Sequence, residues 1–287
     1  MTLLLALAAA ACSPAASTPP GTTGPSGSPT GGPTGAPSLR PVTGGVDHPT
    51  GAKDVVLRVA ESGGFVPVEV SATYAPGFTL YGDGTIVFRD WYAPPPETND
   101  NVGRGVPFQI VRLDEAGIQA LLEDAIGRGG LGAAQGPYHG MGADIPTTTF
   151  TINAGGRTKE VSVTGLSPDM HPGNELIVTA LADLAERLRT FGEAVPGEQP
   201  YVAAGYNGVL IPADQPFGPV VAWPWADVQP DDFGGEDEFF LHRAMTPEEV
   251  ESLGIPNVMG GIMGVALQKD DKLWTFALRP LLPDEVG

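Results

Sequence analysis

The stretch Phe78-Thr-Leu-Tyr-Gly-Asp-Gly-Thr-Ile-Val-Phe88 contains the clearest fold signal in this chain of 287 residues. Apolar side chains recur at every second position on both sides of its centre, and this period is typical of β-strands. The central Asp83-Gly84 pair tolerates the positive φ angles of a tight hairpin turn. The stretch therefore predicts a β-hairpin, with Phe78 and Leu80 alternating on one side of the turn and Ile86 and Phe88 on the other.

Further strand signals surround this hairpin and lead into a helix. Residues 55–60 and 65–70 predict two strands separated by a Gly-Gly turn, and residues 108–113 predict another short strand. Asp114 then stands as an N-cap before apolar residues at helical spacing. We therefore expect a helix from residue 115 to the glycines near residue 127.

The same order of signals recurs later in the chain. Residues 147–153 and 158–163 predict a second hairpin, and a helix capped by Asn174 is expected to extend to Phe191. We therefore predict an α+β fold for residues 51–195, in which antiparallel hairpins alternate with helices in the order strands, helix, strands, helix.

Residues 196–287 predict a smaller, β-rich C-terminal segment. A strand is expected at 201–211, a short helix opens with a capping box at Thr246, and residues 262–267 and 273–278 form a final hairpin. The pattern fits a separate small domain and an extension of the first sheet equally well.

Residues 13–50 differ in composition from the rest of the chain. Pro, Gly, Ser and Thr make up 29 of these 38 residues. Such a segment buries too little apolar surface to offset its conformational entropy, so we predict a disordered tether.

The net charge of the chain is −19, from 15 basic and 34 acidic residues. This charge repels phosphate groups and argues against nucleic acid as a partner.

The sole cysteine, Cys12, follows an apolar run at residues 3–11. The run is too short to span a bilayer and has the form of a secretory signal. Cys12, with small residues before it, resembles the lipobox of bacterial lipoproteins. The resemblance implies that residues 1–12 are a signal peptide and lipobox, that Cys12 carries acyl chains such as palmitate, and that the protein is anchored on the extracytoplasmic face of the cell membrane. No basic residue precedes the run, so we expect the true start to lie upstream. The alternative is an ordinary secretory signal with an incidental cysteine.

Three short motifs carry a family resemblance. They are Gly63-Gly-Phe-Val-Pro67, the Tyr81-Gly-Asp-Gly-Thr85 turn and Arg279-Pro-Leu-Leu-Pro-Asp-Glu285. Together they resemble uncharacterised secreted lipoproteins of actinobacteria and similar soil bacteria, which contain a small hairpin–helix domain of unknown function. The resemblance implies a location in the cell envelope and supplies no catalytic residue.

An acidic stretch offers the candidate metal ligands, which are Asp227, Asp231, Asp232, Glu236 and Glu238. Asp227 and Glu238 have the spacing of the first and twelfth positions of a calcium loop. Pro230 and Asp232 do not suit the fourth and sixth positions, so the alternative is a solvated acidic loop.

Trp223 and Trp225 are the candidate ligand-binding residues. Their rings suit stacking against a sugar, although paired aromatic residues more often cover a core. Common hydrolase, phosphate-binding and dinucleotide-binding motifs are absent from the sequence, so we assign no catalytic residue.

These observations favour a lipid-anchored envelope protein that binds or scaffolds another molecule without catalysis and needs no cofactor. Its partners would be the membrane, through the lipid anchor, and an envelope protein or glycan. Two alternatives remain open: a secreted hydrolase that uses a pair of acidic residues, and a module stabilised by calcium.

Overall fold

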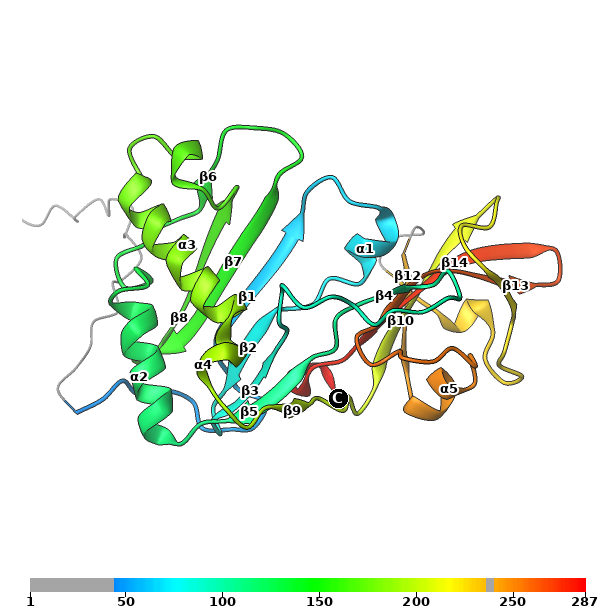
Figure 1. Ribbon diagram of the computed structural model, residues 1–287, viewed down its shortest axis with the longest axis horizontal. Helices are drawn as coiled ribbons and strands as arrows, with labels where there is room; N and C mark the ends of the chain where they lie inside the picture. The colour runs from blue at the N-terminus through cyan, green and yellow to red at the C-terminus, as the bar shows by residue number, and fades with distance from the viewer. Residues whose placement is uncertain (1–43, 236–239) are drawn as a thin grey trace, which may run out of the picture. The chain divides into compact units, whose positions relative to one another are not determined.

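Strands predominate in the computed structural model, which describes residues 44–235 and 240–287 (Figure 1). They form an eight-stranded sheet in the order β6-β8-β7-β1-β2-β3-β5-β9. The bounds of its strands are β1 (Val55–Gly63), β2 (Phe78–Tyr81), β3 (Thr85–Phe88), β5 (Gln109–Arg112), β6 (Tyr138–His139), β7 (Pro146–Ala154), β8 (Arg157–Thr164) and β9 (Gln199–Pro200).

A six-stranded sheet follows in the order β11-β13-β14-β10-β12, with β4 paired to β13. Its strands are β4 (Gly103–Arg104), β10 (Tyr206–Ala213), β11 (Val220–Ala222), β12 (Leu241–Met245), β13 (Ile262–Lys269) and β14 (Lys272–Pro280). The α-helices are α1 (Val68–Ala72), α2 (Glu115–Ile126), α3 (Glu175–Arg189), α4 (Phe191–Ala194) and α5 (Pro247–Glu251). Short 3-10 turns lie at Pro168–Met170, Pro230–Asp232 and Pro283–Glu285.

The predicted alternation of hairpins and helices is wrong as a fold class. The strands expected in two successive strand–helix units belong to one sheet, because β1 pairs with both β2 and β7. The two long helices, α2 and α3, lie on the same face of that sheet (Figure 1). The C-terminal strands build a second large sheet, so the fold is two packed sheets with few helices.

The hairpin expected at residues 78–88 is confirmed. Phe78 pairs with Phe88, and Leu80 pairs with Ile86. These four side chains are at most 1% exposed and belong to the core beneath α2 and α3. Burial of such large apolar residues stabilises the fold by about 1.5–3 kcal/mol each.

The opposite face of the same hairpin is also buried. Tyr81 and Val87 are fully buried in a second core, which contains Phe276 and Leu278 of β14. The hairpin thus lies between the two hydrophobic cores, and its alternation assigns successive side chains to one core or the other.

The strand expected at residues 65–70 is wrong. Gly63 and Gly64 have φ angles of 71° and 83°, which direct the chain away from the sheet, and α1 begins after Pro67. Both edges of β1 are already occupied by β2 and β7. No hydrogen-bonding edge of β1 is left for a third partner.

Two helix caps test the local sequence signals. The side chain of Asp114 accepts a hydrogen bond from the Gly117 amide, as expected at the start of α2. Asn174 occupies the cap position of α3, but its side chain makes no capping hydrogen bond. Thr246 and Glu249 form the expected capping box at α5.

The described chain begins inside the segment that composition assigns to the tether. Val46 is 3% exposed, and its amide donates to Gln119 of α2. The amide of Gly155 donates to the Asp47 carbonyl. These contacts hold residues 44–50 against the fold, whereas residues 13–43 and Cys12 lie outside the described residues.

Strand pairing crosses the boundary predicted at residue 195. β9 pairs with β5 of the eight-stranded sheet, and β4 pairs with β13 of the six-stranded sheet. All described residues belong to one compact unit. None of the described helices has the length and apolar character needed to cross a membrane.

An ion pair joins the first sheet to the C-terminus. Arg58 of β1 donates to both carboxylate oxygens of Asp284 at 2.7 and 2.8 Å, and the hydroxyl of Tyr81 donates to Oδ1 at 2.7 Å. Burial alone would raise the pKa of Asp284, but these hydrogen bonds and the charge of Arg58 outweigh it and lower that pKa below its ordinary value. Burial, followed by the bond to Asp284, raises the pKa of Tyr81.

We predict that Asp284→Asn lowers the free energy of unfolding by about 1–3 kcal/mol at pH 7, because a bidentate charge-assisted interaction is lost. The folded pKa lies below the unfolded value of about 3.9, so this stabilisation is complete above that pH and disappears as the pH falls through the folded pKa.

Urea unfolding of both proteins between pH 3 and pH 7 measures this difference. Asp214→Asn, which changes an exposed carboxylate, is the matched control. A gap between wild type and Asp284→Asn that grows on acidification would contradict the assignment.

Candidate functional site

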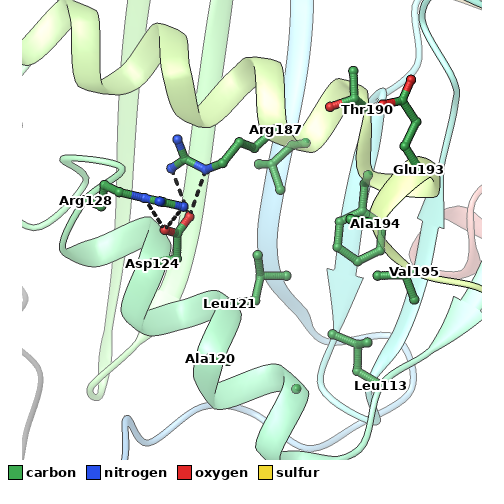
Figure 2. A pocket seen from close by; sticks show the side chains of 13 residues that line it. Leu113, Ala120, Leu121, Asp124, Arg128, Arg187, Thr190, Glu193, Ala194 and Val195 are labelled. Carbon is green, nitrogen blue, oxygen red and sulfur yellow. Dashed lines mark hydrogen bonds and ion pairs between the residues drawn. The ribbon is translucent and has the colours of Figure 1, made fainter.

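A groove separates α2 from the end of α3 and from α4, with a volume of about 630 Å3. This size lies within the range of roughly 300–1,000 Å3 that is typical of small-molecule sites. Its apolar lining comes mainly from Leu113, Ala120, Leu121, Phe191 and Val195. Figure 2 shows Leu121 between Asp124 on one side and Val195 on the other. We call this feature the helix groove.

The helical period of α2 explains why the groove is open. Ile118 and Leu122 are buried against the sheet, whereas Gly117 and Ala120 line the groove. Their small size leaves space that larger side chains would fill. Leu121 is partly buried and packs at the edge of the core beneath the helices.

One end of the helix groove contains an ion-pair network centred on Asp124 (Figure 2). Arg187 of α3 donates to Oδ2 of Asp124 through Nε at 3.1 Å and Nη2 at 2.9 Å. Arg128 donates to Oδ1 at 2.8 Å, and 70% of its side chain is exposed. Two guanidinium groups share one carboxylate, so this trio has a net charge of +1.

Glu193 and Thr190 lie at the other end of the groove (Figure 2). The site is therefore apolar along its length, with an excess positive charge at one end and a carboxylate at the other. Such an arrangement favours a ligand whose apolar body fills the groove and whose anionic group faces Arg128 and Arg187.

The structure places the described part of the acidic stretch at the surface. Asp227, Asp231 and Asp232 are exposed, and Oδ2 of Asp232 accepts a hydrogen bond from the Gln229 amide at 2.7 Å. Asp231 lines a cleft of about 660 Å3 together with Asp214 and other residues. Over residues 44–235 and 240–287, no three His, Cys, Asp or Glu side chains are grouped closely enough to hold a metal ion. Glu236 and Glu238 lie outside the described residues.

Trp223 and Trp225 belong to an aromatic cluster of the second core. Their rings meet edge to face with the ring centroids 5.0 Å apart, and the ring centroid of Trp223 also lies 5.8 Å from that of Trp274. The indole N–H of Trp223 donates to the Val228 carbonyl, and that of Trp225 donates to the Glu249 carbonyl, both at 2.8 Å. Trp225 is 6% exposed and Trp223 is partly buried, so the two rings make internal contacts.

Several carboxyl groups in the described chain have shifted pKa values, and each shift is downward. The hydrogen bond from Thr98 contributes most to Asp100, whose pKa falls to about 2. A general acid would need a raised carboxyl pKa, so these groups act as anionic partners in hydrogen bonds and ion pairs.

The comparisons with known proteins give no similarity from which a function is inferred: no family model, curated protein or solved structure matches this chain.

The residues of the helix groove were not singled out from the sequence. The spacing of four between Asp124 and Arg128 on one helix is a local signal for an ion pair. Arg187 comes 63 residues after Asp124, and its approach depends on how α2 and α3 pack on the sheet.

We predict that Trp225→Ala lowers the free energy of unfolding by about 3–5 kcal/mol, because it leaves a cavity and removes a buried hydrogen bond. Phe65→Ala removes a ring that is 90% exposed and should change stability by less than about 0.5 kcal/mol. Chemical denaturation measures both effects. Equal stability of the two variants would show that the cluster does not stabilise the fold.

Proposed function

We propose that this protein is anchored by acyl chains on Cys12 at the extracytoplasmic face of the cell membrane. In that location, we propose, it binds an amphipathic anion in the helix groove without transforming it. The observation that supports the binding proposal is the helix groove itself, which is mainly apolar, has a volume of about 630 Å3 and ends at two arginines that share one aspartate.

The charges argue for an anionic ligand. The whole chain has a net charge of −19, yet the Asp124, Arg128 and Arg187 trio has an excess positive charge. Glu193 at the opposite end disfavours an anion there and gives the ligand one preferred direction. Because most of the Arg128 side chain is exposed, it can follow an anionic group without leaving a buried cavity.

The apolar lining argues for a ligand with a hydrocarbon body. Leu113, Leu121, Phe191 and Val195 provide surface that gains free energy when covered, at about 25 cal/mol per Å2. A medium-chain carboxylate combines the two properties, with one charge and a flexible apolar chain.

We predict that the purified folded domain binds laurate more tightly than it binds the uncharged alcohol of the same chain length. The double substitution Arg128→Gln/Arg187→Gln should weaken laurate binding about tenfold and leave binding of the alcohol nearly unchanged, because only the charged interaction is removed. Isothermal titration calorimetry at low ionic strength measures both ligands.

Two further variants control this experiment. Ala120→Phe fills the groove and should weaken both ligands, whereas Arg157→Gln changes an exposed arginine outside the groove and should weaken neither. Failure of laurate to bind, or equal loss of both ligands in the double variant, would overturn the proposed ligand. Turnover of a laurate ester would overturn the non-catalytic part.

We predict that Cys12→Ala abolishes acylation and releases the protein into the medium when the natural precursor is expressed in a bacterium that processes lipoproteins. A thioether-linked lipid requires the cysteine sulfur, and stable anchoring requires more than one acyl chain. Labelled palmitate and fractionation provide the measurement, with Ser13→Ala as the control. Retention of Cys12→Ala at the membrane would contradict the anchor.

A further inference from the structure

Arg89 is a partly buried arginine. It follows β3, and its side chain lies over the ring of Phe108, with the guanidinium carbon 4.2 Å from the ring centroid. Its Nε atom is sealed from solvent and makes no hydrogen bond with any described residue. Its Nη2 atom lies 3.4 Å from the Gly260 carbonyl, at the outer limit of a hydrogen bond.

The charge environment of Arg89 differs from that of the other arginines. Eight described arginines have a carboxylate oxygen within 3.5 Å: Arg58, Arg104, Arg112, Arg128, Arg187, Arg189, Arg243 and Arg279. Of the remaining two in the described ranges, Arg157 is exposed to solvent. Arg89 is therefore the partly buried arginine that has no carboxylate partner in the described chain. Lys159 is also buried without a carboxylate, but its Nζ donates to the Leu131 carbonyl at 2.7 Å.

A buried cation without a counter-ion is costly, because its lost hydration is not replaced. Burial, followed by the charge of Arg279, lowers the pKa of Arg89 to about 10. The group still carries its proton at neutral pH. An anion beside it would compensate the lost hydration.

A cavity of about 200 Å3 is lined in part by Arg89. The volume corresponds to that of about seven water molecules in the liquid. Most of its wall is apolar, from Val70, Ala75, Val106, Met263 and the ring of Trp91. Thus the cavity has room for a few carbon atoms and is lined by one cation, Arg89, and one carboxylate, Glu61.

The remaining polar groups of the cavity are held by other partners. Glu61 is paired with Arg189, whose guanidinium also lies 5.0 Å from the centre of the Trp91 ring. The Trp91 ring packs so closely on Gly77 that any side chain at position 77 would collide with it. The wall beside Arg89 is therefore built by fixed contacts.

We propose that this cavity binds a small organic monoanion, a carboxylate of about three or four carbons, whose carboxylate pairs with Arg89 and whose apolar end lies against Trp91 and Met263. Arginine presents a planar group of donors that matches a carboxylate. Phosphate and chloride lack an apolar end that would contact this wall. The site is distinct from the helix groove, with which it shares no lining residue.

Titration of the full chain with butyrate tests the proposal, by calorimetry and by the midpoint of thermal unfolding. Butyrate should bind and raise Tm as its concentration increases. Arg89→Met should weaken butyrate binding at least tenfold. Without ligand it should be as stable as wild type or more stable, because it removes an uncompensated charge. A merely structural role of Arg89 would instead lower Tm in the absence of ligand.

Matched variants separate this site from the others. Ala75→Leu fills the cavity and should weaken butyrate without changing the charge, whereas Arg157→Met should change neither binding nor Tm. Arg128→Gln/Arg187→Gln should leave butyrate binding intact, so failure of the helix-groove proposal does not affect this test. The proposal is overturned if butyrate does not bind, if Arg89→Met binds it normally, or if phosphate or chloride binds as tightly.

Discussion

Burial of the β2–β3 hairpin on both of its faces is the constraint on which the rest of the structure depends. Because side chains in a strand alternate, Phe78, Leu80, Ile86 and Phe88 enter the core beneath α2 and α3, while Tyr81 and Val87 enter the core shared with β14. A shift of one residue in register would exchange the two sets and place the Tyr81 hydroxyl in the wrong core. The two cores therefore fix the same register independently, and the Asp83-Gly84 turn is short enough to maintain it.

Charge compensation connects elements that are distant in the sequence. Arg58 of β1 reaches Asp284, and Arg187 of α3 reaches Asp124 of α2. Each cation is partly withdrawn from water and pairs with a carboxylate, and loss of one partner would leave the other charge uncompensated. In a chain with 34 acidic residues, carboxylates are not scarce. The absence of a carboxylate partner for the partly buried Arg89 is therefore more informative here than it would be in a basic protein.

The sequence predicted local structure well where neighbouring residues determine it. The 78–88 hairpin, the Asp114 cap of α2 and the Thr246 capping box all depend on residues within a few positions of one another. Residues 65–70 were misassigned because their β-forming side chains gave no sign that both edges of β1 are taken by β2 and β7. The fold class failed for the same reason: two similar strand–helix runs look like two units, and only long-range pairing merges them into one sheet. Asp124 and Arg128 carry a local signal, but Arg187 and the space beside them arise from packing.

The two cavities differ in the physical origin of their selectivity. At the helix groove, the positive charge of the exposed Arg128 mainly directs an approaching anion. The length of the apolar lining determines how much of a ligand's hydrocarbon chain is covered. The cavity beside Arg89 is smaller and more enclosed by aromatic and aliphatic walls, so the same charge interaction is less screened there. The cavity beside Arg89 is too small for a long hydrocarbon chain. A short anion gains little binding free energy in the helix groove, because solvent screens the charges of Arg128 and Arg187. The length of an anion's hydrocarbon chain therefore decides whether it suits the helix groove or the cavity beside Arg89.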